Sequence, residues 1–284
     1  MKFFHIGAMA DSFRLPAKEA LLKVKEVGAE GYQIYASNGS FAPDNLDAKA
    51  RSEFKKYSDS LGLTISALCG DLGRGFYDRD YNKILVEKSK KILQLAADLD
   101  THVVTTHIGV VPEDMNGERF ETMHDACLEL AKAADDIGVK FAVETGPETS
   151  LTLRRFLDTL NSKGVSVNLD PANLVMVTGD DPVQAVYNLK DYIVHTHAKD
   201  GKMLTKGDPE IIYGLKPPPA GGIPAPFIEV PLGEGSVDFP KYLAALHDIG
   251  FSGFLTIERE VGEDPAKDIA MAVNFLKNTV ARLK

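Results

Sequence analysis

The stretch Val165-Ser-Val-Asn-Leu-Asp170 decides the fold, because its side chains alternate strictly in character. Valine and leucine occupy every second position, and serine, asparagine and aspartate fill the positions between them. Successive side chains of a β-strand point to opposite faces. The segment therefore predicts a strand with one apolar face packed beneath helices, while its polar face must point into the interior of a closed barrel.

Further β-rich segments lie on both sides of that strand. The strands of the whole chain are predicted to begin near Phe3, Gly31, Leu63, His102, Lys140, Val165, Tyr192 and Phe254. Between them apolar residues recur every three or four positions, most clearly over 82–99 and 120–137, which is typical of a helix with one apolar face. Glycines that suit a left-handed helix cap follow such stretches at Gly28, Gly62, Gly138, Gly164 and Gly250.

Strands that alternate with helices predict parallel pairing, because each crossover returns the chain in the same direction. A closed barrel and an open doubly wound sheet both satisfy this rule, but the number of strands and their polar inner faces favour closure. The length of 284 residues is ordinary for one such barrel. We therefore expect an α/β fold, a single (β/α)₈ TIM barrel over residues 1–284.

The composition argues against several other classes of protein. A formal net charge of −9 opposes attraction to nucleic acid or to an anionic membrane. No apolar run approaches the ~20 residues that span a bilayer, and the first residues lack the features of a signal peptide. Nothing pairs the two cysteines, Cys69 and Cys127. We expect a cytoplasmic protein that binds neither nucleic acid nor membrane.

One segment, residues 201–235, interrupts the alternation of strand and helix. It is rich in glycine and proline, and includes Pro217-Pro-Pro219 and Gly221-Gly222. Such a composition excludes a regular helix or a central strand. Because the segment follows the seventh strand, we expect it at the carboxyl-terminal mouth of the barrel. A solvated excursion is one interpretation; a lid or an oligomer contact is favoured, since long loops in compact domains commonly serve a function.

Four consecutive strands end in a polar side chain on the inward face, and these are Glu144, Asp170, His197 and Glu258. In a closed barrel they converge at the mouth, where barrel enzymes hold their active sites. Three carboxylates there would repel one another unless a cation joined them. This mostly hard ligand set suits Mn²⁺, Mg²⁺ or Co²⁺ better than a structural Zn²⁺ site, although Zn²⁺ is compatible. Each residue alone would be an ordinary solvated strand end; four equivalent positions indicate a site.

At these residues the sequence resembles the sugar phosphate isomerase/epimerase superfamily, the xylose isomerase-like TIM barrels. That superfamily includes ketose 3-epimerases, inosose dehydratases and, more distantly, a class of apurinic endonucleases. The resemblance covers nearly the whole chain. It rests on four blocks: Phe141-Ala-Val-Glu-Thr-Gly-Pro147, Val167-Asn-Leu-Asp-Pro-Ala-Asn173, Val194-His-Thr-His-Ala-Lys-Asp200 and Gly253-Phe-Leu-Thr-Ile-Glu-Arg259.

The resemblance implies a role for each of the four residues. Glu144 and Glu258 would be metal ligands and the two catalytic bases, while Asp170 and His197 would be ligands only. One position departs from the ketose epimerases of the superfamily. They commonly carry a substrate-binding histidine three residues after the ligand aspartate, where this chain has Asn173. The resemblance therefore defines the metal site better than the substrate.

Further polar residues are expected near the mouth. His107 ends the fourth strand and is predicted to contact substrate. Lys199 could hold a substrate oxygen or neutralise Asp200. Glu148 could bond sugar hydroxyls, although a carboxylate near a helix N-terminus is favourable for electrostatic reasons alone. Asn173 is the fourth candidate for substrate binding.

Other histidines and arginines receive lesser roles from their positions. His195 points inward one layer deeper, which suits support of a ligand, and His5 on the first strand is a weaker candidate. Arg259 should point away from the barrel and form structural ion pairs. Arg74 lies in a glycine-rich mouth loop without dinucleotide-binding spacing. No phosphate-cradling motif appears, so a phosphorylated substrate is unsupported.

The predicted activity is that of a divalent-metal-dependent sugar isomerase or epimerase, which moves a proton alpha to a ketose carbonyl through an enediolate. The alternative is an inosose-dehydratase-like lyase acting on a keto-inositol. An abasic-site endonuclease is disfavoured by the scarcity of histidines and by the negative charge. A barrel that binds a sugar without turning it over is disfavoured because all four ligands are present. Relatives are often dimers or tetramers, which implies a homodimer or homotetramer.

Overall fold

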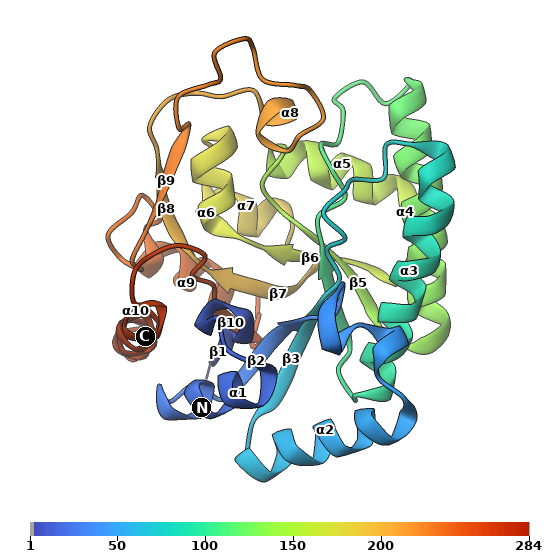
Figure 1. Cartoon of the computed structure of the whole chain (residues 1–284). Coiled ribbons are helices and arrows are strands. Elements are labelled where there is room, and N and C mark those ends of the chain that lie inside the picture. Colours follow the sequence, from blue (N-terminus) through green and yellow to red (C-terminus); the bar gives the residue numbers. More distant parts are fainter. Residues whose placement is uncertain (1–2, 284) are drawn as a thin grey trace.

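A closed barrel of parallel strands forms the centre of the computed structural model, which describes residues 3–283 (Figure 1). The strand order around the wall is β1-β2-β3-β4-β5-β6-β7-β10. These strands are β1 (His5–Met9), β2 (Gly31–Tyr35), β3 (Thr64–Cys69), β4 (Val103–Thr106), β5 (Lys140–Glu144), β6 (Val165–Leu169), β7 (Ile193–Ala198) and β10 (Phe254–Ile257). The pairing of β1 with β10 closes the ring and confirms the barrel over the open sheet. Residues 1, 2 and 284 of the predicted span lie outside the described residues.

Helices surround the barrel wall (Figure 1). The longer ones are α1 (Ala17–Glu26), α2 (Ala48–Leu61), α3 (Arg79–Asp98), α4 (Glu118–Ile137), α5 (Ser150–Leu160), α7 (Pro182–Asn188), α9 (Phe239–Asp248) and α10 (Pro265–Val280). Short helical turns are η1 (Ala10–Phe13), η2 (Gly39–Phe41), η3 (Pro43–Asn45), α6 (Pro171–Asn173), η4 (Leu174–Thr178) and α8 (Pro209–Ile212). The two helices predicted from periodicity are confirmed as α3 and α4. Across residues 3–283 we find no helix with the length and apolar character that crossing a membrane requires.

The alternation in β6 has the predicted structural effect. Its apolar side chains are buried in the hydrophobic core between strands and helices. The side chains of Ser166 and Asn168 are buried as well, and Asn168 reaches polar partners on the neighbouring strands. The barrel interior is therefore polar near its carboxyl-terminal end.

One predicted helix cap is wrong. Four of the five glycines do adopt positive φ angles after helices, at Gly28, Gly62, Gly138 and Gly250. Helix α5 instead ends at Asn161, which takes the left-handed conformation with φ of 43°. Gly164 is needed for a different reason, since a Cβ atom there would overlap the carbonyl oxygen of Ala131 on α4.

The glycine- and proline-rich segment is more ordered at its ends than the composition predicts. β8 (Asp200–Met203) pairs antiparallel with β9 (Phe227–Val230), and α8 lies between them. The prolines cluster at 217–226, in the middle, so the ends remain free to form strands. We call residues 200–237 the covering segment. Figure 1 shows it beside α6, at the end of the barrel to which β6 leads.

Candidate active site

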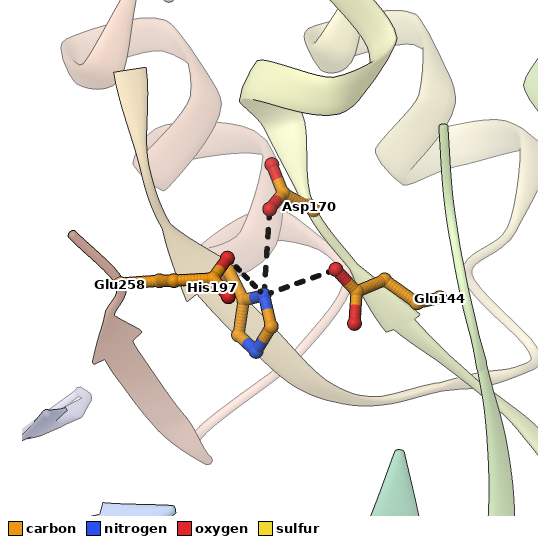
Figure 2. A group of neighbouring side chains, drawn as sticks. All are labelled: Glu144, Asp170, His197 and Glu258. Atoms are coloured by element: carbon orange, nitrogen blue, oxygen red, sulfur yellow. Dashed lines mark hydrogen bonds and ion pairs between the residues drawn. The ribbon is translucent and has the colours of Figure 1, made fainter. Parts of the chain in front are cut away.

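A cavity of about 630 Å³ opens at the carboxyl ends of the barrel strands. Glu144 is the last residue of β5, His197 lies in β7, and Asp170 and Glu258 directly follow β6 and β10. One ligand-type atom from each of these four side chains lies within 4.8 Å of the others. All four are at most 7% exposed. The structure thus brings together the four residues that the sequence selected (Figure 2).

The imidazole of His197 lies at the centre of the group (Figure 2). Its Nδ1 is 3.4 Å from Glu144 Oε1, 3.4 Å from Asp170 Oδ2 and 3.2 Å from Glu258 Oε2. Burial opposes charge on this ring, but the carboxylates of Glu144 and Glu258 outweigh burial and raise the pKa of His197 well above its usual range. The cluster therefore demands positive charge at this point.

Hydrogen bonds fix which nitrogen of His197 faces the carboxylates. Gln33 donates from Nε2 to Thr105 Oγ1 over 2.8 Å, which leaves its Oε1 to accept from His197 Nε2 at 3.0 Å. In the tautomer that donates to Gln33, Nε2 of His197 carries the hydrogen and Nδ1 turns a lone pair toward three carboxylate oxygens. That arrangement is repulsive unless a proton or a cation lies between them. Three carboxylates and one imidazole nitrogen with its second nitrogen so anchored fit a divalent ion.

Asp170 and Glu144 are also held in place by local bonds. Asp170 Oδ1 accepts from the backbone N–H groups of Ala172 and Asn173, at 2.8 and 3.0 Å, so that Oδ2 is left to face His197. Asn168 donates from Nδ2 to Glu144 Oε2 over 3.2 Å. The positive charges of His107 and His197 outweigh burial and lower the pKa of Glu144. Both carboxylates are thus oriented by hydrogen bonds within the protein.

Three of the four predicted substrate contacts line the cavity: His107, Asn173 and Lys199. His107 bonds through Nδ1 to Asp71 Oδ2 at 3.0 Å, and its Nε2 has no hydrogen-bond partner. Asn173 donates to Glu144 Oε1 over 3.2 Å. Lys199 donates to Glu258 Oε2 over 3.1 Å and to Glu260 Oε2 over 2.7 Å.

Glu148, the fourth predicted contact, lies outside the lining of this cavity. Its Oε2 accepts from the backbone N–H of Val111 over 3.1 Å, and its Oε1 has no partner. Burial raises the pKa of the Glu148 carboxyl to about 8. The residue lines a neighbouring cavity of about 420 Å³. Its placement therefore does not support the expected contact with a sugar in the main cavity.

The remaining histidine and arginine predictions have distinct outcomes. His195 bonds Asn168 Oδ1 at 2.8 Å and Thr256 Oγ1 at 2.9 Å, which fits the expected supporting position. His5 begins β1 and pairs at the surface with Glu30, so it takes no part in the site. Arg259 pairs with Glu229 and Asp268, as expected for a structural residue.

The sequence did not identify several parts of the cavity. Gln33 is a single polar residue in an otherwise mostly apolar strand, and that isolation is the only signal that it carries. The covering segment contributes Ile212, Tyr213, Phe227, Ile228 and Glu229 to the lining. The ring of Tyr213 lies 5.5 Å from that of His107. The expectation that this segment acts at the mouth therefore agrees with its location.

Comparison with known proteins gives consistent results. Residues 21–279 match the family described as xylose isomerase-like TIM barrel. The chain is 27% identical over 154 residues to an inosose dehydratase of Lacticaseibacillus casei, which covers 53% of this chain and 49% of that protein. It is 26% identical over 204 residues to an L-ribulose-5-phosphate 3-epimerase of Escherichia coli, covering 69% and 64%. The chain thus aligns with about half of the dehydratase and less than two thirds of the epimerase.

Solved structures share the fold over the whole chain. A xylose isomerase domain protein from Planctomyces limnophilus superposes with a TM-score of 0.82 over 99% of both chains, at 23% identity. Further structural neighbours include a D-psicose 3-epimerase, an L-ribulose 3-epimerase and a protein described as a probable 3-DHS dehydratase. At these identities the likeness establishes the barrel alone.

Proposed function

The chain belongs to the xylose isomerase-like TIM barrel family, and from that premise we propose that it is a divalent-metal-dependent sugar isomerase or epimerase. One observation carries the proposal. Three carboxylates and an imidazole, all buried, direct their ligand atoms to one point at the mouth of the barrel. The ions that suit this set are Mn²⁺, Mg²⁺ and Co²⁺, with Zn²⁺ also compatible.

Glu144, Asp170, His197 and Glu258 would hold the ion. When bound, the ion would polarise the carbonyl of a ketose and so acidify the neighbouring C–H group. Glu144 and Glu258 come from strands separated by β6 and β7, so they can approach a sugar from two sides. One carboxylate can take the proton from the carbon alpha to the carbonyl, and the other can return it to the opposite face. Return to the opposite face inverts the carbon, which is epimerisation; return to the adjacent carbon is isomerisation.

Neighbouring residues prepare these carboxylates and orient the sugar. Lys199 and His197 outweigh burial and lower the pKa of Glu258, so the carboxylate stays ionised and ready to accept a proton. Nε2 of His107, held in place by the bond from Nδ1 to Asp71, lies 3.7 Å from Glu144 Oε1 and makes no hydrogen bond, so it is available to a sugar oxygen. Tyr213 from the covering segment would exclude water from that side. The ring also packs against the buried cluster of Ala172, Met176 and Val177, which holds it over the cavity and supports a closed site.

A dehydratase is the second candidate, and His107 is the observation that favours it. Burial opposes charge on this imidazole, but Glu144 and Asp71 raise its pKa to about 9. A protonated Nε2 at neutral pH can donate to a departing β-hydroxyl group, which a dehydration requires. The named activity of the Lacticaseibacillus casei relative points in the same direction. A keto-inositol is the substrate that this alternative predicts.

The test uses Mn²⁺-loaded protein with a panel of ketoses and a keto-inositol in D₂O. Solvent deuterium at the carbon alpha to the carbonyl, with an epimeric or isomeric product, supports the proposal; loss of water from the cyclitol supports the dehydratase. Glu144→Gln should abolish exchange, while Glu148→Gln, a buried glutamate outside the cavity, should retain it. A complete absence of exchange with all substrates would leave a sugar-binding barrel and contradict both activities.

The same preparation tests the remaining expectations. Incubation with abasic DNA should produce no nick, because the proposed substrate is a small sugar and the net charge is −9. A homodimer or homotetramer is expected in solution, and light scattering measures it. A cytoplasmic location is part of the same proposal, and fractionation of the source cells tests it.

A further inference from the structure

Asp200 fills a ring of backbone N–H groups beside the cavity. Its Oδ1 accepts from Gly201 and Val237 at 2.9 and 3.1 Å, and its Oδ2 accepts from Gly233 and Gly235 at 3.0 and 2.9 Å. Gly235 must lack a side chain, because a Cβ atom there would overlap the carboxylate. Barrel enzymes commonly bind phosphate with N–H groups of the loops after the last two strands. Here the loop after β7 turns its N–H groups onto the chain's own anion.

Other backbone N–H groups at the mouth are occupied in the same way. The N–H groups of Ala172 and Asn173, after β6, bond to Asp170 Oδ1. The N–H of Glu260, after β10, bonds to Glu229 Oε1 over 3.2 Å. The N–H of Gly73, after β3, bonds to Asp71 Oδ1 over 2.7 Å. Internal carboxylates thus satisfy donors that an anionic substrate would need.

The side chains of the cavity add to this effect. Within the described residues, its lining holds one lysine, Lys199, and no arginine. Lys199 already bonds to two carboxylates. Acidic side chains at or beside the cavity are Asp71, Glu144, Asp170, Glu229, Glu258 and Glu260. Glu229 is already paired with Arg259 behind the cavity. The carboxylates remain in excess even when this arginine, Lys199 and a divalent ion are all counted, so the field in the cavity stays unfavourable to a further anion.

The outer wall of the cavity is apolar. It is formed by Met176, Val177, Ile212, Phe227, Ile228 and Val261. A phosphate group at the end of the sugar remote from the metal ligands would lose hydration against these side chains without gaining a cation. Uncharged carbon and hydroxyl groups lose far less hydration free energy at the same place.

The backbone N–H groups are occupied by internal carboxylates, the carboxylates of the cavity are in excess, and its outer wall is apolar. From these features we propose that the substrate is an uncharged, unphosphorylated keto sugar, and that the site rejects the phosphate ester of the same sugar. The proposal rests on the proposed function and narrows its substrate class. It separates this chain from its relative in Escherichia coli, which is named for a phosphorylated ketose.

The experiment compares kcat/KM for each free ketose with that for its terminal phosphate ester, using Mn²⁺-loaded protein. We expect the ester to be poorer by about 100-fold, the usual scale for a poorly matched like charge. An ester that is turned over as well as the free sugar, or better, overturns the inference while the proposed function stands. If neither is turned over, the proposed function fails. Calorimetric titration of the same pairs then tests the inference on its own: tighter binding of the ester overturns it, and tighter binding of the free sugar supports it.

A substitution on the outer wall tests the electrostatic reason. Ile228 is 47% exposed and lines the cavity, so Ile228→Lys adds a cation at the rim, with Ile228→Gln as a polar variant of similar size but without charge. The ratio of ester to free-sugar kcat/KM should rise about 10-fold in the lysine variant, since one partly screened charge pair has this strength. An equal rise in the glutamine variant, or no rise in the lysine variant, would contradict the charge argument.

Discussion

The barrel wall and the covering segment build opposite halves of one cavity by different means. The wall supplies Glu144, His197 and their partners from regular strands, where alternation determines the direction of each side chain. The covering segment supplies Tyr213, Phe227 and Glu229 from a short helix and a two-stranded hairpin. Strands hold atoms in place for chemistry, and a segment outside the barrel can vary its contacts without disturbing them. Under the proposed function, we expect the wall to carry the reaction and the covering segment to select the substrate.

The largest effect should follow loss of a ligand on the wall. Asp170→Asn removes a charge that faces His197 Nδ1 and keeps the side-chain shape. We expect kcat/KM to fall about 1000-fold, because the polarising ion contributes several kcal/mol to the barrier. Chelation of the wild type should give a loss of the same order, reversed by Mn²⁺. Full activity and unchanged Mn²⁺ affinity in the Asp170→Asn variant would contradict the assignment of the reaction to the barrel wall.

A smaller loss is expected for the residue that anchors His197. Gln33→Leu removes the acceptor of the Nε2–H bond, so the ring is free to rotate or change tautomer. Mn²⁺ affinity should fall about 10–100-fold, as for other partners of metal-binding histidines. Titration with Mn²⁺ followed by electron paramagnetic resonance measures it. Gln184→Leu, on the surface of α7, is the matched control and should bind Mn²⁺ normally.

The covering segment should respond differently. Tyr213→Ala removes the ring that packs near His107, 5.5 Å away between ring centres. We expect KM to rise about 10-fold through lost apolar contact, with Mn²⁺ affinity unchanged. A comparable fall in Mn²⁺ affinity would show that wall and segment act as one unit rather than two.

The smallest expected effect is a change in the pH dependence of stability at Glu148. Burial raises the pKa of this carboxyl from 4.5 to about 8. Because the pKa is higher in the folded state, the contribution of this carboxyl to the free energy of unfolding is fully present below pH 4.5. That contribution is lost as the pH rises through about 8. The free energy of unfolding should therefore fall less between pH 4.5 and about 8 in the Glu148→Gln variant than in the wild type, as measured by urea denaturation at several pH values. A wild type whose stability rises over this window, with the variant unchanged from it, would contradict the assignment.

The sequence was most informative where local pattern and final geometry coincide. The alternation in β5, β6, β7 and β10 predicts which side chains point inward, and a closed barrel then brings their ends together. Because each strand end is equivalent, the pattern selected Glu144, Asp170, His197 and Glu258 without knowledge of any contact. The barrel and its convergence of strand ends were thus accessible from the chain alone.

Other features depend on contacts between distant segments. Gln33 meets His197 across the barrel, and nothing near Gln33 in the sequence encodes that meeting. Tyr213 lies in a stretch without periodicity, so its place follows from the packing of α8. Gly164 illustrates a third case, since a glycine after a helix serves equally as a cap or as a site of close backbone approach. The structure distinguishes these uses, and here close approach to α4 is the reason.

The ring of backbone N–H groups around Asp200 has a consequence for how this barrel can change. The Asp200 carboxylate bonds to backbone N–H groups at the start of the covering segment, at Gly201, and at its end, at Gly235 and Val237. The end of β7 and the start of α9 are thereby held close together. Residues 204 and 226 are joined by a backbone hydrogen bond, so the stretch between them begins and ends at one place and its length is not set by the barrel strands. Replacing that stretch alone would change the residues that cover the cavity while the barrel and its metal-binding side chains stay the same.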